Sequence, residues 1–189
     1  MTVTRMHGFA FCALAILATG CAQLKAPPYA ADYEALDLLK ATKPAAVAVV
    51  KVEPTDPNDA VNNLSLRGAR LVSPSGTFAK YLEDALISDL KEVSAYDAKS
   101  RTRIDARILS NEISVGNIVT GTGVMEVQIE VTREGVQRLK KTYKANTSFE
   151  SSFAGIVAIP AGQAAYSDLV RALLRQVYAD PQFATALAS

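Results

Sequence analysis

The sequence predicts an α+β domain, with an antiparallel sheet of about four strands and two amphipathic helices packed on one face. Three segments between residues 104 and 149 alternate apolar and polar residues, which is the period of a half-buried strand. Two further segments, 74–93 and 163–178, place apolar residues at helical spacing on one side. Both helix stripes can be buried against one apolar sheet face, which makes a single core.

The predicted elements begin with a strand over 46–52, where valines are dense, and a weaker strand over 64–72. The first helix follows, with Ser73 or Ser75 as its expected N-cap. Its apolar stripe comprises Phe78, Tyr81, Leu82, Ala85, Leu86, Leu90 and Val93. Lysine and acidic residues fall largely on the other side, so this helix should cover a core.

Three alternating strands come next in the chain. Their apolar positions are Ile104, Ala106 and Ile108, then Val127, Ile129 and Val131, then Leu139, Tyr143, Ala145 and Phe149. Gly121 and Gly123 mark the first expected connection and Glu134-Gly135 the second. Short connections of this kind predict antiparallel hairpins with one solvated face.

The second helix is expected over 163–178, after a break at Pro160. Its stripe comprises Tyr166, Leu169, Val170, Leu173, Leu174 and Val177. Asp180-Pro181 should end this helix and cap a final short turn through Phe183 and Leu187.

Residues 1–20 have the plan of a secretory signal peptide. Arg5 precedes an apolar run from Phe9 to Ala18. That run is too short for a membrane-spanning helix, which needs about 20 residues. The stretch Leu17-Ala18-Thr19-Gly20-Cys21 resembles a bacterial lipobox, although Ala18 stands where leucine is commonest. The resemblance implies cleavage between Gly20 and Cys21 and lipid on Cys21; ordinary signal cleavage is the alternative.

The residues after the expected cleavage site bear on where the chain goes. Resemblance to enterobacterial sorting rules implies the outer membrane, because Ala22 replaces the aspartate that signals inner-membrane retention. We therefore expect a protein lipid-anchored in the outer membrane and facing the periplasm. Residues 21–45, which include Pro27-Pro28, are expected to form a lipidated tether. Residues 46–189 are expected to form a single periplasmic α+β domain.

The composition of the remaining chain excludes several classes of function. Removing residues 1–20 takes away one arginine and no acid, so 19 basic and 19 acidic residues remain and cancel. A neutral domain has no general attraction for nucleic acid. The single histidine, His7, leaves with Cys12, so the usual Ser-His-Asp, Cys-His and zinc arrangements cannot be built. We expect no enzyme activity, no cofactor and no metal.

Several short motifs have simpler structural interpretations. Ser88 and Lys91 match a Ser-x-x-Lys spacing without its companion motifs, so both are expected to be solvent-facing helix residues. The acidic stretch 56–59 lacks the later ligands of a calcium loop and is expected to be a turn. Glu126 and Glu130 share one strand face, which is expected to be solvated. The Gly-x-Gly at 121–123 lacks the setting of a dinucleotide site.

An apolar group within 153–159 is the remaining candidate site. It comprises Phe153, Ile156, Val157 and Ile159. A buried connection explains it most simply, and the alternative is an exposed contact for an envelope protein or a lipid.

A family resemblance rests on the run Lys140-Lys141-Thr142-Tyr143-Lys144-Ala145-Asn146-Thr147-Ser148-Phe149-Glu150-Ser151-Ser152-Phe153. This run resembles the third-strand segment of YajG-type lipoproteins, with similarity over roughly residues 68–187. The element order is also similar to PqiC-like auxiliary lipoproteins of lipid transport. These resemblances imply a non-enzymatic envelope lipoprotein that acts as a binding or assembly module. The alternative is an auxiliary subunit of an envelope lipid or ABC transport system.

Overall fold

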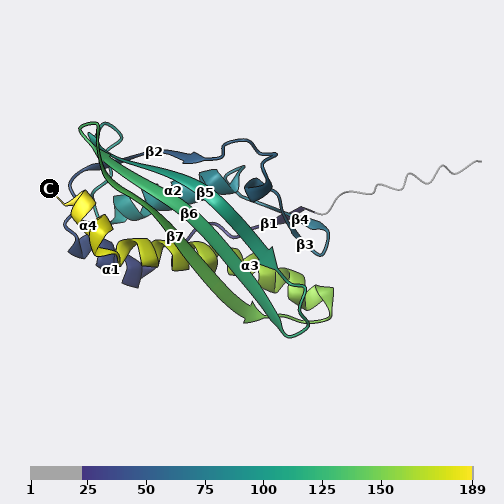
Figure 1. Ribbon diagram of the computed structural model, residues 1–189. Coiled ribbons are helices and arrows are strands. Elements are labelled where there is room, and N and C mark those ends of the chain that lie inside the picture. The colour runs from purple at the N-terminus through teal and green to yellow at the C-terminus, as the bar shows by residue number, and fades with distance from the viewer. Residues whose placement is uncertain (1–22, 189) are drawn as a thin grey trace, which may run out of the picture.

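The computed structural model describes residues 23–188, which form four α-helices, one short 3-10 helix and seven strands (Figure 1). In chain order these are β1 (Gln23–Lys25), α1 (Tyr33–Ala41), β2 (Val47–Glu53), η1 (Ala60–Asn62), β3 (Leu64–Leu66), β4 (Ala69–Val72), α2 (Phe78–Glu92), β5 (Thr102–Ser114), β6 (Thr120–Arg133), β7 (Val136–Glu150), α3 (Gly155–Tyr178) and α4 (Pro181–Leu187). The predicted signal peptide and the lipidation site Cys21 lie outside the described residues.

The main sheet has the strand order β2-β5-β6-β7. The pairs β5–β6 and β6–β7 are antiparallel, as the short connections predict. Strand β2 pairs with β5 in the parallel direction, so the sheet is mixed and the purely antiparallel expectation is wrong at this edge. The reason is the connection, because α2 lies between the two strands and carries the chain back to the edge where β2 begins.

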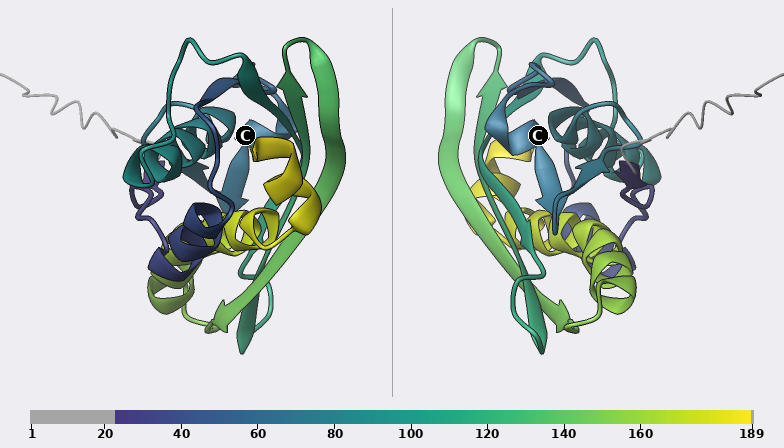
Figure 2. Two further views of the ribbon diagram at one scale, coloured as in Figure 1. Left: turned by 90° about the vertical axis from the view of Figure 1, so that its left-hand side faces the viewer. Right: turned by 90° about the vertical axis from the view of Figure 1, so that its right-hand side faces the viewer.

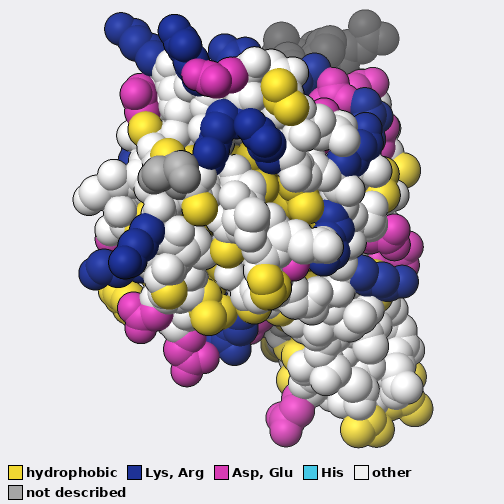
Figure 3. Space-filling model, turned by 60° about the vertical axis from the view of Figure 1, so that its left-hand side comes forward, with side chains coloured by type: hydrophobic (Ala, Val, Ile, Leu, Met, Phe, Trp, Pro, Cys, Tyr) yellow, Lys and Arg dark blue, Asp and Glu magenta, His cyan; other side chains and the backbone are white. Residues whose placement is uncertain are grey.

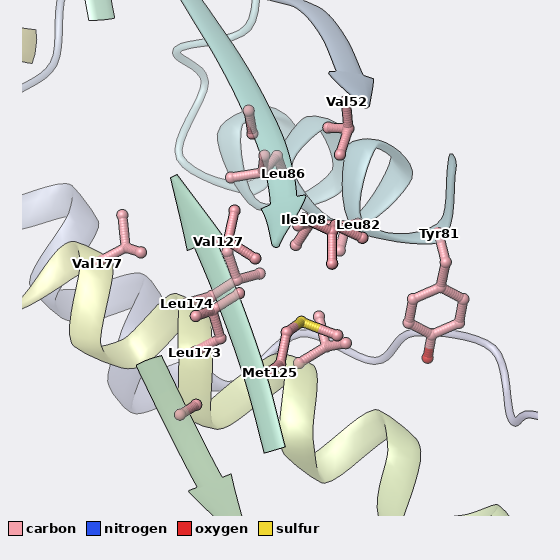
Figure 4. Close-up of a cluster of buried hydrophobic side chains, with 14 of the residues drawn as sticks. Val52, Tyr81, Leu82, Leu86, Ile108, Met125, Val127, Leu173, Leu174 and Val177 are labelled. Atoms are coloured by element: carbon pink, nitrogen blue, oxygen red, sulfur yellow. The ribbon is translucent and has the colours of Figure 1, made fainter. Parts of the chain in front are cut away.

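Helices α2 and α3 cover the same face of this sheet, which confirms the predicted α+β arrangement (Figure 2). Figure 4 shows their side chains meeting those of β5 and β6: Leu82 and Leu86 from α2, Leu173, Leu174 and Val177 from α3, and Ile108, Met125 and Val127 from the strands. The apolar stripe predicted for the second helix is buried in full, and that of the first is buried except for the half-buried Val93. Helical periodicity therefore identified the core correctly.

A bulge in β5 explains a change of side-chain parity. The pairing with β6 shifts between Ile108 and Ser110, and Leu109 is exposed. Even-numbered residues through Ile108 face the core, and the odd-numbered Asn111 and Ile113 face it afterwards. An extra residue in one strand of a pair has this effect.

Residues 23–45 pack on the domain, whereas the sequence suggested a tether. Strand β1 pairs with β4, and α1 lies against α3. Leu36 and Leu39 are buried at helical spacing, and Asp32 caps α1 by accepting from the Glu34 amide at 3.1 Å. The prolines and alanines suggested an extended linker. The amphipathic helix α1 that follows them buries enough apolar surface against α3 to hold the segment on the domain.

The start of α2 depends on a residue distant in sequence. Thr77, rather than Ser73 or Ser75, is the N-cap and accepts from the Lys80 amide. The buried Asn62 side chain accepts from the amides of Phe78 and Ala79 at 2.9 and 3.1 Å. Two more free amides of the first helical turn are thereby satisfied.

Gly121 and Gly123 lie inside β6, so their predicted place in a connection is wrong; the β5–β6 connection is 115–119. A Cβ at Gly121 would lie 2.2 Å from the Phe149 ring. One at Gly123 would lie 2.6 Å from the Thr147 side chain and 3.2 Å from Leu169. Both glycines therefore allow close packing on the sheet face.

Candidate functional site

Helix α3 begins eight residues earlier than the sequence predicts, at Gly155. Pro160 lies inside this helix, where it removes one backbone hydrogen bond, and this is why a break was expected there. Packing outweighs that loss, because Ala158 and Gly162 are buried and Ile159 packs against the core. A Cβ at Gly162 would lie 2.8 Å from Val115, so the glycine brings the helix close to the β5–β6 connection.

The extra turns of α3 and the residue just before its N-cap carry exposed apolar side chains. Phe153 is 82% exposed, Ile156 86% and Val157 54%, whereas Ile159, the fourth member of the predicted apolar group, is half-buried. The group is therefore divided between the surface and the core, and neither interpretation from the sequence describes all of it.

A second exposed apolar pair lies beside this group. Ile118 is 60% exposed and Val119 73%, both in the β5–β6 connection. The Ser151 amide donates to the Val119 carbonyl at 2.9 Å, which joins the two connections. We call Ile118, Val119, Phe153, Ile156 and Val157 the apolar tip. Hydrophobic side chains are exposed at the end of the lower lobe in Figure 3, and Figure 1 shows that α3 begins at the lower end of the strands.

The chain around the apolar tip carries no formal charge over long stretches. Residues 113–125 and 151–167 contain no Asp, Glu, Lys, Arg or His. Charged residues are present on other surfaces, for example in the cross-strand pair Glu130–Lys140 at 3.2 Å. An exposed, uncharged apolar cluster of this kind is typical of a contact site.

Arg67 stabilises the base of the tip. Its guanidinium donates to the carbonyls of Ser152 and Phe153, both at 2.6 Å, and to that of Val115 at 3.1 and 3.3 Å. Arg67 lies in the β3–β4 turn with a φ of 50°, followed by Gly68 at 84°. Successive positive φ values are those of a tight hairpin turn, which aims this side chain at both connections.

The N-terminal strand lies at the same end of the molecule. Strand β1 runs parallel to β4, with Gln23 opposite Arg70 and Lys25 opposite Val72. The chain before Gln23 therefore points toward the Arg67 turn. The Gln163 side-chain amide of α3 donates to the Lys25 carbonyl. Figure 1 shows β1, β4 and the first turns of α3 on the side opposite the C-terminus.

The buried carboxylate Asp89 was not identified from the sequence, because it falls within an apolar helix stripe. It accepts hydrogen bonds from the Tyr29 and Tyr178 hydroxyls, each at 2.9 Å. Burial raises the pKa of Asp89 to about 6, although both hydroxyls act in the opposite direction. The side chain is fully buried, so we interpret it as a link between α2, α3 and the N-terminal segment.

The residues of the short motifs, Ser88 with Lys91 and the acidic stretch 56–59, contact neighbouring parts of the domain. Lys91 is exposed as expected, with its amine 5.3 Å from the centre of the Tyr96 ring, whereas Ser88 is half-buried on α2 rather than solvent-facing. Asp56 and Asp59 accept from nearby backbone amides, as turn residues do. Within residues 23–188, no three His, Cys, Asp or Glu side chains are grouped as a metal site. Over the same range no helix is both long and apolar enough to span a membrane.

Comparison with known proteins supports the fold. No family model and no curated protein matches the chain. A crystal structure from Xanthomonas campestris, of the DUF330 family, is similar with a TM-score of 0.55 and 11% identity, over 75% of this chain and 85% of that one. A candidate lipoprotein from Caulobacter crescentus has a TM-score of 0.47 and 13% identity, over 82% and 96%. A minor lipoprotein from Acinetobacter baumannii has 0.45 and 11%, over 74% and 90%.

Proposed function

We propose that this chain is a non-enzymatic envelope lipoprotein, anchored through lipidated Cys21, that acts as a binding or assembly module. The observation that carries the proposal is Leu17-Ala18-Thr19-Gly20-Cys21 directly after a signal-like apolar run. Several acyl chains on one cysteine hold a domain stably on a bilayer, whereas a single chain does so only marginally.

The residue inventory of the domain supports a non-enzymatic role. After cleavage the chain has no histidine and no cysteine other than Cys21. The buried carboxylate Asp89 is engaged by two tyrosine hydroxyls in the protein interior. The apolar tip, in contrast, offers a surface for contact rather than groups for acid–base or nucleophilic chemistry.

Lipid attachment is tested by labelling cells with a radioactive fatty acid and by fractionating membranes. Wild type and Cys12→Ser should incorporate label and float with the membranes, because residue 12 leaves with the signal peptide. Cys21→Ser should lose both properties. Recovery of unlabelled wild-type protein in the soluble periplasm would contradict the proposal.

We propose the outer membrane as the location, with the domain facing the periplasm. Ala22 supports this, because the sorting rule places aspartate at this position in inner-membrane lipoproteins. In a cell with two membranes, wild type and Ala22→Ser should band with the outer membrane on a density gradient. Ala22→Asp should move to the inner-membrane fraction. Unchanged banding of Ala22→Asp would remove the basis for this location.

The alternative role is that of an auxiliary subunit of an envelope lipid or ABC transport system. The element order similar to PqiC-like lipoproteins supports it, together with an exposed surface on an anchored domain. In vivo crosslinking and mass spectrometry should then recover a transporter component with wild type and lose it with Cys21→Ser. Recovery of no transporter component would leave the binding-module proposal in place.

A further inference from the structure

We propose that the apolar tip enters the same bilayer that holds the Cys21 anchor, so that the domain contacts the membrane at two points. The occupant of this surface is therefore the lipid bilayer. The inference rests on the proposed lipid attachment at Cys21. It adds a second, non-covalent contact and a fixed orientation of the domain.

The described chain begins at the end of the domain that carries the tip. Cys21 precedes Gln23 by two residues, and an extended chain spans about 3.3–3.6 Å per residue, so the two Cα atoms lie within about 7 Å of each other. Gln23 lies at the end of β1 that faces the Arg67 turn. Because Arg67 binds the Ser152 and Phe153 carbonyls directly, the first described residue of the chain and the tip lie at the same end of the domain.

Helix α3 connects the same two features. The Gln163 side chain contacts the Lys25 carbonyl, and Ile156 lies seven residues earlier on the helix. At 1.5 Å per residue these helix positions are about 10 Å apart. The start of α3 thus lies roughly two turns from its contact with Lys25, at the end of the domain where β1 begins. Because only Ala22 separates Cys21 from Gln23, a bilayer that holds the Cys21 lipid can contact the start of α3.

The composition and the hydrogen bonding of the tip both suit lipid. Five large apolar side chains project from stretches without charged residues, so their insertion takes no charge from those stretches out of water. The exposed Arg67 guanidinium lies at the base of the tip, where its charge stays at the level of the headgroups. Backbone carbonyls without partners are costly in lipid, and Arg67 satisfies those of Ser152, Phe153 and Val115. An apolar face of this type lies roughly 5–10 Å deep at the headgroup boundary.

The test uses tryptophan fluorescence, since the chain contains no tryptophan. The full chain, processed in a bacterial host and purified in detergent, is reconstituted into vesicles as Phe153→Trp. The matched control is Val136→Trp, an exposed position at the β6–β7 turn. The 14 residues of β6 separate the two ends by roughly 45 Å at about 3.3 Å per residue.

The tryptophan at position 153 should shift its emission to shorter wavelength on reconstitution. It should lose most of its intensity when the lipids carry bromine on their acyl chains. The tryptophan at position 136 should show neither change. Adding Ile156→Asp and Val157→Asp to Phe153→Trp should remove the quenching, while thermal unfolding shows that the domain remains folded.

Two failures are distinguishable in this experiment. If the wild-type chain does not float with vesicles, lipid attachment is absent and the proposed function fails. If it floats but position 153 is quenched no more than position 136, the anchor is present and only the second contact is overturned. The tip would then face water or a protein partner.

Discussion

The Tyr29 hydroxyl lies 3.1 and 2.9 Å from the two carboxylate oxygens of Asp89, 60 residues away in the sequence. Tyr178 donates to the same carboxylate from α3. The Tyr81 hydroxyl donates to the Pro27 carbonyl at 2.9 Å, two residues before Tyr29. These bonds hold the N-terminal segment on the domain, and with it the direction in which the chain leaves toward Cys21.

Removing the Tyr29 hydroxyl should destabilise the domain. Tyr29→Phe leaves a buried carboxylate with one donor fewer, which costs about 1–3 kcal/mol in unfolding free energy. Tyr33→Phe, on the exposed surface of α1, is the matched control and should change little. Urea unfolding at pH 7 measures both. Equal stability of the two variants would show that the bond to Asp89 contributes nothing.

The same carboxylate should make stability depend on pH. Because the pKa of Asp89 is raised from 3.8 to about 6, the folded state binds its proton more tightly than the unfolded state does. The stabilisation of the folded state by this proton is therefore fully present below pH 3.8 and is lost as the pH rises through 6. The loss is about 3 kcal/mol, because a tenfold difference in proton affinity between the two states corresponds to about 1.36 kcal/mol.

Asp89→Asn should remove this part of the pH dependence, because an amide does not titrate. Urea unfolding between pH 4 and 7 should show the difference between wild type and Asp89→Asn growing as the pH rises. Asp37→Asn, which changes an exposed acid on α1, is the control and should follow wild type. Parallel curves for wild type and Asp89→Asn would contradict the raised pKa.

Asp180 should show the opposite dependence on pH. It caps α4 through the Gln182 amide and accepts from Lys141 at 2.8 Å and Tyr143 at 2.6 Å. Burial raises the pKa of Asp180, but the Lys141 and Tyr143 hydrogen bonds outweigh it, so the pKa lies below 3.8. The stabilisation is present above pH 3.8 and is lost as the pH falls through the lowered pKa.

Replacing Asp180 tests this assignment directly. Asp180→Ala removes the cap and should cost about 1–2 kcal/mol at pH 7, whereas Asp180→Asn retains a capping oxygen and should cost less. Chemical unfolding followed from pH 7 downward, through the pH at which Asp180 becomes protonated, separates the effects. A pH dependence of unfolding free energy that is the same in wild type and Asp180→Asn at acid pH would argue against a role for the charge.

A side chain at Gly162 should overpack the junction between α3 and the strands. In Gly162→Val the new Cβ would meet Val115 at 2.8 Å and Leu66 at 3.1 Å, both in buried side chains. Overpacking of this kind costs about 1–3 kcal/mol. Ala164→Val, an exposed position on the same helix, is the control for the introduced valine. Thermal unfolding midpoints compare the two, and equal midpoints would show that the junction can expand.

Arg67 should control the order of the apolar tip. Arg67→Ala leaves three carbonyls without their donor, so amide hydrogen exchange should accelerate in residues 151–158 and 115–119 while the sheet centre is unchanged. Arg70→Ala, an exposed arginine on β4, is the control. Unchanged exchange in Arg67→Ala would mean that packing alone orders the tip.

Local periodicity was sufficient for the core. The alternation around Ile129 and the helical stripe around Leu173 predicted burial correctly, because every second or every third and fourth side chain faces the same way whatever the partner. The α4 cap at Asp180 was predicted for a similar local reason, since Asp-Pro is a helix start.

Contacts between distant segments account for the features that the sequence did not predict. The residues near β2 do not indicate its parallel pairing with β5. The sequence of 23–45 does not indicate that the Tyr29 hydroxyl donates a hydrogen bond to Asp89. Pro160 suggested a break that packing of α3 overrides. Local sequence was enough to identify the apolar faces, and the lipobox before them stays a prediction. Folding in three dimensions brought Val119 beside Ser151 at the end of the domain where β1 begins, because that arrangement depends on hydrogen bonds and packing across the whole domain.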